Sequence, residues 1–325
     1  MNNTIEACSE KNMSKTIAKI YKKYGILLIL LVLIAVSAIL NPAFFTINNL
    51  TNVFRQIVVV MIIACGAQLI IISGNIDLSA GSVVGLSGVI GADIMVKTNS
   101  LILAVLAGLL IGLACGWLNG FIITKLSIPA FIMTLAMQTI VRGIIFVYTD
   151  AVPISNLGDF TLIGQGYIGP IPIPVIIMVI ILILTWVLLN KRKTGRYLYA
   201  VGGNSNAAKA SGINVSKIRL FAFLYGGLMA GLAGIILTSR MNSGQPLSGQ
   251  NLEFDAITAV IIGGTSLSGG VGKLSGTVFG GLLIGFLGNI MNLQGVSSYY
   301  QQIVQGVIIA LAVIVDVRVR SAMQK

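Results

Sequence analysis

Long apolar runs without a charged side chain are the feature that most constrains the fold of this chain. Residues 57–73 and 101–123 are two such runs, and charged residues make up only 9% of the 325 positions. An ordinary soluble domain carries about 25% charged residues, because its surface faces water. In lipid, every backbone polar group needs an internal partner, which leaves helices or closed barrels, and runs without period-two alternation favour helices. The sequence therefore predicts an all-α, polytopic membrane protein.

Scanning the chain for apolar stretches predicts about ten transmembrane helices. Two stretches are atypical, because 80–96 is dense in glycine and serine and 256–265 is too short to cross a bilayer alone. Short or glycine-interrupted segments often mark broken helices beside a transport path. We expect one transmembrane domain at 25–316, flanked by segments 1–24 and 317–325. The ten predicted spans are 25–40, 57–73, 80–96, 101–123, 128–148, 172–190, 218–238, 256–265, 275–293 and 300–316.

The lysines and arginines are distributed unevenly between the two predicted sides. With the N-terminus inside, seventeen fall on the cytoplasmic side, and only Arg55, Lys97 and Arg240 lie near the outer side. This bias follows the positive-inside rule. The net charge of +12 therefore indicates how the chain is oriented in the membrane, and we expect no nucleic-acid partner. The prediction is a multi-pass protein of the cell inner membrane with both termini cytoplasmic and a cytoplasmic loop at 191–217. The first apolar run is expected to be kept as a helix, since no signal-peptide cleavage site follows it.

The run GGVGK at 269–273 superficially resembles a phosphate-binding loop. The motif G-x-x-x-x-G-K-[ST] requires glycine at 267 and Ser or Thr at 274, where the chain has Leu267 and Leu274. The sequence also contains no histidine, which excludes histidine metal sites, histidine proton relays and Ser-His triads. We therefore expect no enzymatic activity, no catalytic residue, no metal site and no cofactor in this chain. Any energy from a nucleotide must come from another chain.

Glycines recur every four residues along one face of the predicted helix 101–123. Removal of Cβ atoms lets a neighbouring helix approach closely, as in small-xxx-small packing. Packing explains these glycines, and a pore-lining role is the alternative. The series consists of Gly108, Gly112, Gly116 and Gly120, and the pair Gly227 and Gly231 repeats the spacing.

The segment 195–213 predicts a short helix with little to bury by itself. Asn204 or Ser205 can cap this helix, which runs through about Ser211, and Gly212 can end it in the left-handed conformation. A small Ala-rich helix of this kind is typical of an element that docks in a groove of another protein. An ordinary capped loop helix is the alternative.

Four blocks of the sequence resemble the permeases of ribose-type ABC sugar importers, a monosaccharide importer family within the branched-chain amino acid/ribose permease superfamily. The resemblance runs from about Asn41 to Asp316. The chain departs from the family's sequence pattern at two positions. Asn75 stands where the family usually has glycine, and Phe254 stands where it has leucine. The four blocks are 73–82, 195–213, 245–277 and 295–316.

The resemblance implies a ten-helix permease of the type II ABC-importer kind that works by alternating access. It implies as partners a second permease copy or paralogue, a cytoplasmic ABC ATPase, a periplasmic sugar-binding protein and membrane lipid. The implied substrate is ribose, and xylose, galactose or an autoinducer-type ligand are alternatives. An ion-coupled secondary transporter is disfavoured, because the chain lacks histidine and its acidic residues mostly lie outside the span centres.

The resemblance also implies roles for particular residues. Helix 204–212 would be the coupling helix, and Asp77 would lie at the cytoplasmic end of the second span. The candidates for coupling to the ATPase are Gly195, Arg196, Asn204, Ala207, Ala208, Ser211 and Gly212. The outer acidic residues Asp159, Glu253 and Asp255 are candidates for docking the binding protein.

Polar residues in or beside the spans are candidates for the sugar pathway or its gate. A sugar pathway needs weak hydrogen bonders, because tight binding would stall release. Interhelical hydrogen bonds would explain the uncharged residues equally well, and Asp77 could instead cap the helix that follows it. The candidates are Gln68, Asp77, Ser79, Asn119 and Asn289.

Overall fold

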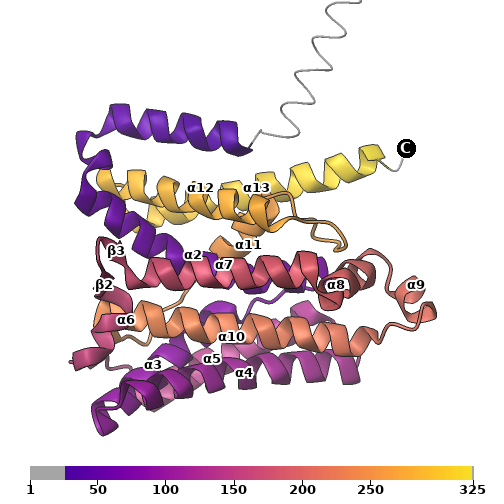
Figure 1. Cartoon of the computed structure of the whole chain (residues 1–325), viewed down its shortest axis with the longest axis horizontal. Coiled ribbons are helices and arrows are strands. Elements are labelled where there is room, and N and C mark those ends of the chain that lie inside the picture. Colours follow the sequence, from indigo (N-terminus) through magenta and orange to yellow (C-terminus); the bar gives the residue numbers. More distant parts are fainter. Residues whose placement is uncertain (1–25, 324–325) are drawn as a thin grey trace, which may run out of the picture.

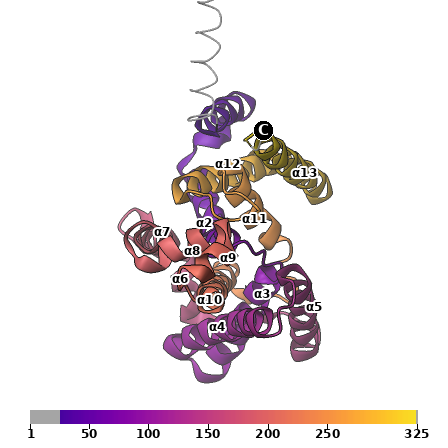
Figure 2. The same cartoon turned by 90° about the vertical axis from the view of Figure 1, so that its right-hand side faces the viewer.

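The computed structural model describes residues 26–323, with side-chain surroundings through residue 314. The predicted segment 1–24 lies outside the described residues. The structure is a bundle of long helices that lie side by side in Figure 1 and are seen close to end-on in Figure 2. We call the end that carries α8 and α9 the α9 end, and the end that carries the short strands the β end. The predicted all-α fold is confirmed, apart from four strands of two residues each.

Ten of the helices coincide in position with the ten predicted spans. They are the N-terminal helix Ile26–Leu40, α2 (Ile47–Ile72), α3 (Ala80–Thr98), α4 (Leu101–Lys125), α5 (Ala130–Thr149), α7 (Ile173–Lys191), α10 (Val215–Met241), α11 (Leu252–Ile262), α12 (Leu274–Leu293) and α13 (Ser298–Met323). The smaller elements are η1 (Pro42–Phe45), β1 (Ile154–Ser155), η2 (Gly158–Phe160), α6 (Thr161–Gln165), β2 (Tyr167–Ile168), β3 (Ile171–Pro172), α8 (Lys193–Gly203), α9 (Ser205–Ala210) and β4 (Ser243–Gly244).

Seven of the helices in the described part of the chain are long and apolar enough to cross a membrane alone. They are α2, α3, α4, α5, α7, α10 and α12, whereas Ile26–Leu40 and Ser298–Ile314 are shorter apolar stretches. The chain is therefore a multi-pass membrane protein, and ten crossings stay a prediction. Helix α2 starts ten residues before its predicted span. Asn48, Asn49 and Arg55 lower the hydropathy of residues 47–56, whereas the cap by Thr46 starts the helix at Ile47. At the other end of the chain, residues 317–323 continue α13.

Two central helices hold the bundle together. Helix α2 is buried over most of its length and packs against α10, α11 and α12, while α10 packs against α2, α3 and α4. The outer helices α4, α5 and α7 instead expose large apolar side chains, such as Ile102, Val147 and Ile183. Apolar surface of this extent is typical of a face that contacts lipid rather than water.

The glycine series of α4 makes the close helix packing that its spacing predicts. A Cβ atom on Gly112 would lie 2.3 Å from the carbonyl oxygen of Gly227, and one on Gly227 would lie 2.2 Å from that of Gly112. No side chain fits between α4 and α10 at this point. The backbones of the two helices are therefore in direct contact, and the packing interpretation is confirmed.

The segment 149–171 between α5 and α7 is partly buried. Strand β1 pairs with β4, and the side chains of Leu157 and Phe160 are almost completely buried against the end of the bundle. The backbone N–H of Gly164 donates to the Ser239 hydroxyl at 2.6 Å, and this hydroxyl donates to the carbonyl of Phe160. The apolar side chains of this segment therefore cover part of α10, where Ile235 packs in the same cluster as Leu157 and Phe160.

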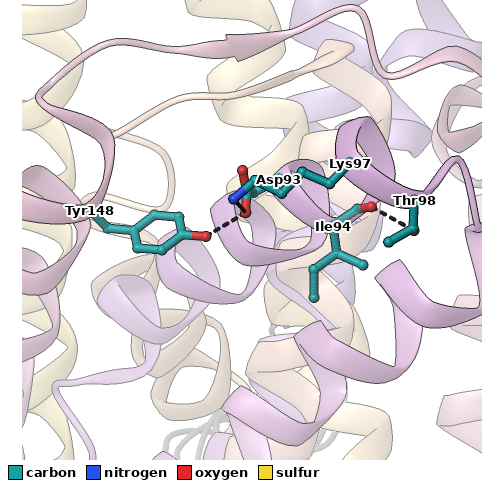
Figure 3. Close-up of polar contacts among 5 residues, drawn as sticks. All are labelled: Asp93, Ile94, Lys97, Thr98 and Tyr148. Atoms are coloured by element: carbon teal, nitrogen blue, oxygen red, sulfur yellow. Dashed lines mark hydrogen bonds and ion pairs between the residues drawn. The ribbon is translucent and has the colours of Figure 1, made fainter.

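A polar contact joins α3 and α5 at the β end (Figure 3). Asp93 accepts hydrogen bonds from Lys97 Nζ at 2.8 Å and from the Tyr148 hydroxyl at 2.5 Å. Lys97, one of the three basic residues predicted on the outer side, is thus paired with an acid. The ion pair lies within α3, so the Tyr148 hydroxyl is the group that joins α5 to α3 here.

Candidate functional site

Three of the candidate pathway residues lie together where α3 begins. Asp77 Oδ1 accepts hydrogen bonds from the backbone N–H of Ser79 at 2.8 Å and from its hydroxyl at 2.6 Å. Asn119 Nδ2, on α4, donates to the same hydroxyl at 2.9 Å. All three residues are buried. Asp77 therefore holds the turn that enters α3, and Asn119 fastens this turn to α4.

A small cavity adjoins this turn in the middle of the bundle. Its volume is about 10 Å³, which is room for about one water molecule and far less than a sugar needs. Its two acidic lining residues are Asp77 and Glu253, which come from different elements. The remaining lining residues are Ile63, Ala67, Ile70, Ala80, Gly226 and Ile257. In this conformation the cavity beside Asp77 has no room for a monosaccharide.

Glu253 lies deep inside the bundle, at the start of α11. The residue is only 2% exposed, and Oε1 accepts a hydrogen bond from Gln138 Nε2 at 2.9 Å. Its other oxygen lies against Gly81, where a Cβ atom would come within 1.9 Å of it. A docked protein cannot reach Glu253 in this conformation. The carboxyl group belongs instead to the lining of the central cavity.

The other two docking candidates lie nearer the surface. Asp159 is exposed on the segment that covers the β end, and Asp255 is partly exposed on α11. The loop before α11 is held by Arg142, which donates to the carbonyls of Pro246 and Ser248 at 2.8 and 3.0 Å. Among the three candidates, Asp159 is the one that a partner can contact without a rearrangement.

The remaining two pathway candidates lie apart from Asp77 and from each other. Gln68 Nε2 donates to the Thr265 hydroxyl at 2.9 Å, and Gln68 Oε1 accepts from the Thr277 hydroxyl. Asn289 exchanges two hydrogen bonds with Asn49, at 2.8 and 3.1 Å. Each of these amides joins α2 to the α11–α12 region. Both contacts are interhelical hydrogen bonds, which membrane bundles use to fix helix pairs.

The predicted coupling segment lies at the α9 end, beyond the ends of the long helices (Figure 1). The Asn204 side chain accepts from the backbone N–H of Ala207 at 3.0 Å, and Gly212 has a φ of +81°, so both caps are confirmed. Arg196, Asn204, Ala207, Ser211 and Gly212 are exposed, while Gly195 and Ala208 are buried. The short helix thus presents alanine and polar groups outward.

The sequence did not predict α8, which occupies 11 residues of the expected loop at 191–217. Only Gly195, Leu198 and Val201 are buried on its inner face, and this is too short a pattern for helical periodicity to stand out. Tyr199 was also missed, although its hydroxyl donates to the carbonyl of Gly272 at 2.9 Å. In the sequence, the Gly-Gly pairs at 202–203 and 269–270 are the feature that could have indicated close backbone contact between α8 and the loop before α12.

Two observations concern the metal and phosphate sites that the sequence argues against. No group of three or more His, Cys, Asp or Glu residues within the described ranges is arranged to hold a metal. The GGVGK run forms a turn between α11 and α12, and the backbone N–H of Gly270 donates to the carbonyl of Ile72 at 2.9 Å. This N–H group is therefore used inside the fold rather than presented to a phosphate.

Comparison with known proteins places this architecture in a family. Residues 49–313 match the family described as the permease component of branched-chain amino acid transport systems. The ribose import permease protein RbsC of Escherichia coli (strain K12) is 47% identical over 89% of this chain and 92% of that protein. The protein of the same name from Haemophilus influenzae is 45% identical over 88% of this chain and 90% of that protein. The one from Bacillus subtilis (strain 168) is 45% identical over 91% of this chain and 93% of that protein. No solved structure matches the chain. The chain therefore belongs to the family of permease components of branched-chain amino acid transport systems.

Proposed function

We propose that this chain is the membrane-spanning permease subunit of an ABC importer that carries ribose across the inner membrane. The observation that carries the proposal is the similarity to three ribose import permeases along nearly the whole chain. Two structural features support it. The bundle exposes apolar side chains on its outer helices, as a lipid-facing protein does. Helix α9 exposes most of its alanine and polar side chains at one end of the bundle.

The energy source in this proposal is a separate ATPase chain. The GGVGK turn uses the Gly270 N–H internally and lacks the sequence of a phosphate loop, which agrees with that division of labour. The ATPase would contact α9 and the exposed Arg196 of α8, which places the α9 end in the cytoplasm. Most basic residues among positions 26–314 also lie at this end, among them Lys125, Arg192 and Lys273.

The transport step in this proposal is alternating access by two permease copies, with a sugar-binding protein that docks at the β end. The cavity beside Asp77 has no room for a sugar, so the helices around it must separate before a sugar can pass. We assign the turn 73–79, with Asp77, Ser79 and Asn119, to the gate. Gln68 and Asn289 would hold α11 and α12 to α2 during this movement.

Reconstitution tests the proposal. The chain is placed in proteoliposomes with its ATPase and binding protein, and uptake of labelled ribose is measured. Uptake is expected to require ATP, the ATPase and the binding protein together. Uptake that persists without the ATPase and collapses with an ion gradient would instead identify a secondary transporter. Equal flux in both directions without the binding protein would identify a channel. Competition by unlabelled xylose or galactose stronger than that by ribose would assign another sugar.

A further inference from the structure

Five glycines bring three distant segments into backbone contact at the α9 end. Gly74 follows α2, Gly202 and Gly203 end α8, and Gly269 and Gly270 lie in the loop 263–273 between α11 and α12. A Cβ atom on Gly202 would lie 1.7 Å from the carbonyl oxygen of Ile72 and 2.6 Å from the nitrogen of Gly270. One on Gly269 would lie 2.8 Å from the Cα of Gly74. No side chain separates α8 from the loop 263–273 or from the end of α2.

Hydrogen bonds reinforce the same contact. The backbone N–H of Gly270 donates to the carbonyl of Ile72 at 2.9 Å. The Tyr199 hydroxyl reaches from α8 to the carbonyl of Gly272, also at 2.9 Å. Burial raises the pKa of Tyr199 above its usual range, so the hydroxyl stays protonated and able to donate at neutral pH. Helix α8 is thus attached to the loop by one backbone contact and one side-chain contact.

The loop 263–273 is itself a compact turn. The backbone N–H of Ser266 donates to the carbonyl of Val271, and that of Gly269 donates to the carbonyl of Ser266, both at 3.0 Å. Thr265 at its start and Thr277 just after it are both bonded to Gln68 of α2. Because these bonds close the turn on itself, a displacement of its tip carries the ends of α11 and α12 with it.

Helix α11 links this turn to the centre of the bundle. The helix has only 11 residues, a length of about 16 Å at the rise of an α-helix. One end joins the loop 263–273, and the other carries Glu253 beside the cavity that Asp77 also lines. A rigid helix of this length transmits a shift at the turn to the cavity with little loss, since packed backbone interfaces do not deform continuously.

We propose that Tyr199 and Gly202 are the positioning residues that transmit movement of α8 and α9 to the central cavity, through the loop 263–273 and α11. The inference rests on the proposed function and adds the path by which movement at the ATPase contact reaches the central cavity. A second route is available, because α8 and α9 also contact α10. The experiment must therefore separate the loop contact from the general attachment of α8.

Adjacent glycines of α8 supply the matched pair of variants. Gly202→Ala forces the backbone of α8 away from Ile72, whereas a Cβ atom on Gly203 meets nothing within 4 Å. The variants Gly202→Ala, Gly203→Ala and Tyr199→Phe are each reconstituted with the ATPase and the binding protein. The measurements are thermal unfolding of the permease, co-purification of the ATPase, basal ATP hydrolysis, stimulation of hydrolysis by sugar-loaded binding protein, and ribose taken up per ATP hydrolysed.

If the loop 263–273 transmits the movement, the variants should lose the coupling between ATP hydrolysis and ribose uptake and keep the other activities. Tyr199→Phe and Gly202→Ala should keep ATPase binding and basal hydrolysis, while sugar-dependent stimulation and ribose per ATP fall by at least about fivefold, the lower end of typical coupling between sites. Gly203→Ala should behave as the wild type. If Gly202→Ala does not fold, Tyr199→Phe decides, because it removes one hydroxyl and keeps the ring.

Two results would overturn the inference while leaving the proposed function intact. One is wild-type coupling in folded Gly202→Ala and Tyr199→Phe, which would place the transmission in the α10 contact. The other is a joint loss of thermal stability, ATPase binding and uptake, which would make the contact structural only. If the wild-type complex shows no ATP-dependent uptake at all, the proposed function fails and the inference falls with it.

Discussion

The side-chain amide of Asn119 on α4 donates a hydrogen bond to the hydroxyl of Ser79, 40 positions earlier in the chain. The same hydroxyl donates its own proton to Asp77. One serine therefore links an amide on α4 to a buried carboxylate at the start of α3. Without the Ser79 donors the Asp77 carboxyl group would be poorly satisfied inside the bundle, where an unpaired polar group is costly.

Replacement of this serine should weaken the fold. Ser79→Ala removes a donor from buried Asp77 and the acceptor of Asn119, and a buried polar group left without its partner costs about 1–3 kcal/mol. We expect a loss of about that size in the free energy of unfolding, measured in detergent. Ser82→Ala is the control, because the Ser82 hydroxyl is buried without a hydrogen-bond partner among the described residues. Equal losses in the two variants would contradict the role of Ser79.

The contact between α4 and α10 should be intolerant of a single methyl group. Gly112→Ala places a Cβ atom 2.3 Å from the Gly227 carbonyl oxygen, so the helices must move apart, at a cost of about 1–3 kcal/mol. Thermal unfolding in detergent measures this loss. Gly143→Ala, on α5, is the matched control, since its Cβ atom meets nothing within 4 Å and alanine is the better helix former. A fall for Gly143→Ala as large as that for Gly112→Ala would argue against close packing as the cause.

The pair Asn49 and Asn289 should be energetically coupled. The two amides exchange hydrogen bonds between α2 and α12, and interhelical hydrogen bonds in membranes contribute about 0.6–2 kcal/mol. A double-mutant cycle of Asn49→Ala and Asn289→Ala, read by unfolding in detergent, should give a coupling energy in this range. Simple additivity of the two single losses would show that the contact contributes nothing measurable.

Helix α9 should be required for coupling and dispensable for insertion. Replacement of 204–212 by a Gly/Ser segment of equal length removes the Asn204 cap and the exposed alanine surface. We expect normal membrane insertion and normal binding of the sugar-binding protein, with loss of sugar-stimulated ATP hydrolysis. Stimulation that stays at the wild-type level would show that the ATPase docks elsewhere.

The orientation can be tested with a membrane-impermeant thiol reagent. Lys97→Cys at the β end should react in intact cells, whereas Lys209→Cys on α9 should react only after the membrane is permeabilised. Native Cys65 and Cys115 are buried and should stay silent, and Cys8 is replaced by serine in both variants. Labelling of Lys209→Cys in intact cells would reverse the assignment of the two sides.

Sequence reasoning and structure agree where the signal is local. The ten helices lie where apolar runs predict them, since helix formation in lipid needs only a continuous apolar stretch. Asn204 and Gly212 end α9 as expected, because a cap involves neighbours a few positions away. Agreement is poorer at 47–56 and 193–203, where polar residues occupy helical turns and the apolar pattern is short.

The sequence by itself determined the membrane class and the positions and order of the ten apolar helices, because hydropathy and capping act over a few residues along the chain. Only the tertiary structure decided which groups meet. It buried Glu253, expected to be a docking residue, beside a central cavity, and it brought Gly202 against Ile72 across 130 positions. Contacts of this kind depend on how helices pack in three dimensions, and a missing side chain in one segment does not indicate which distant backbone fills the space.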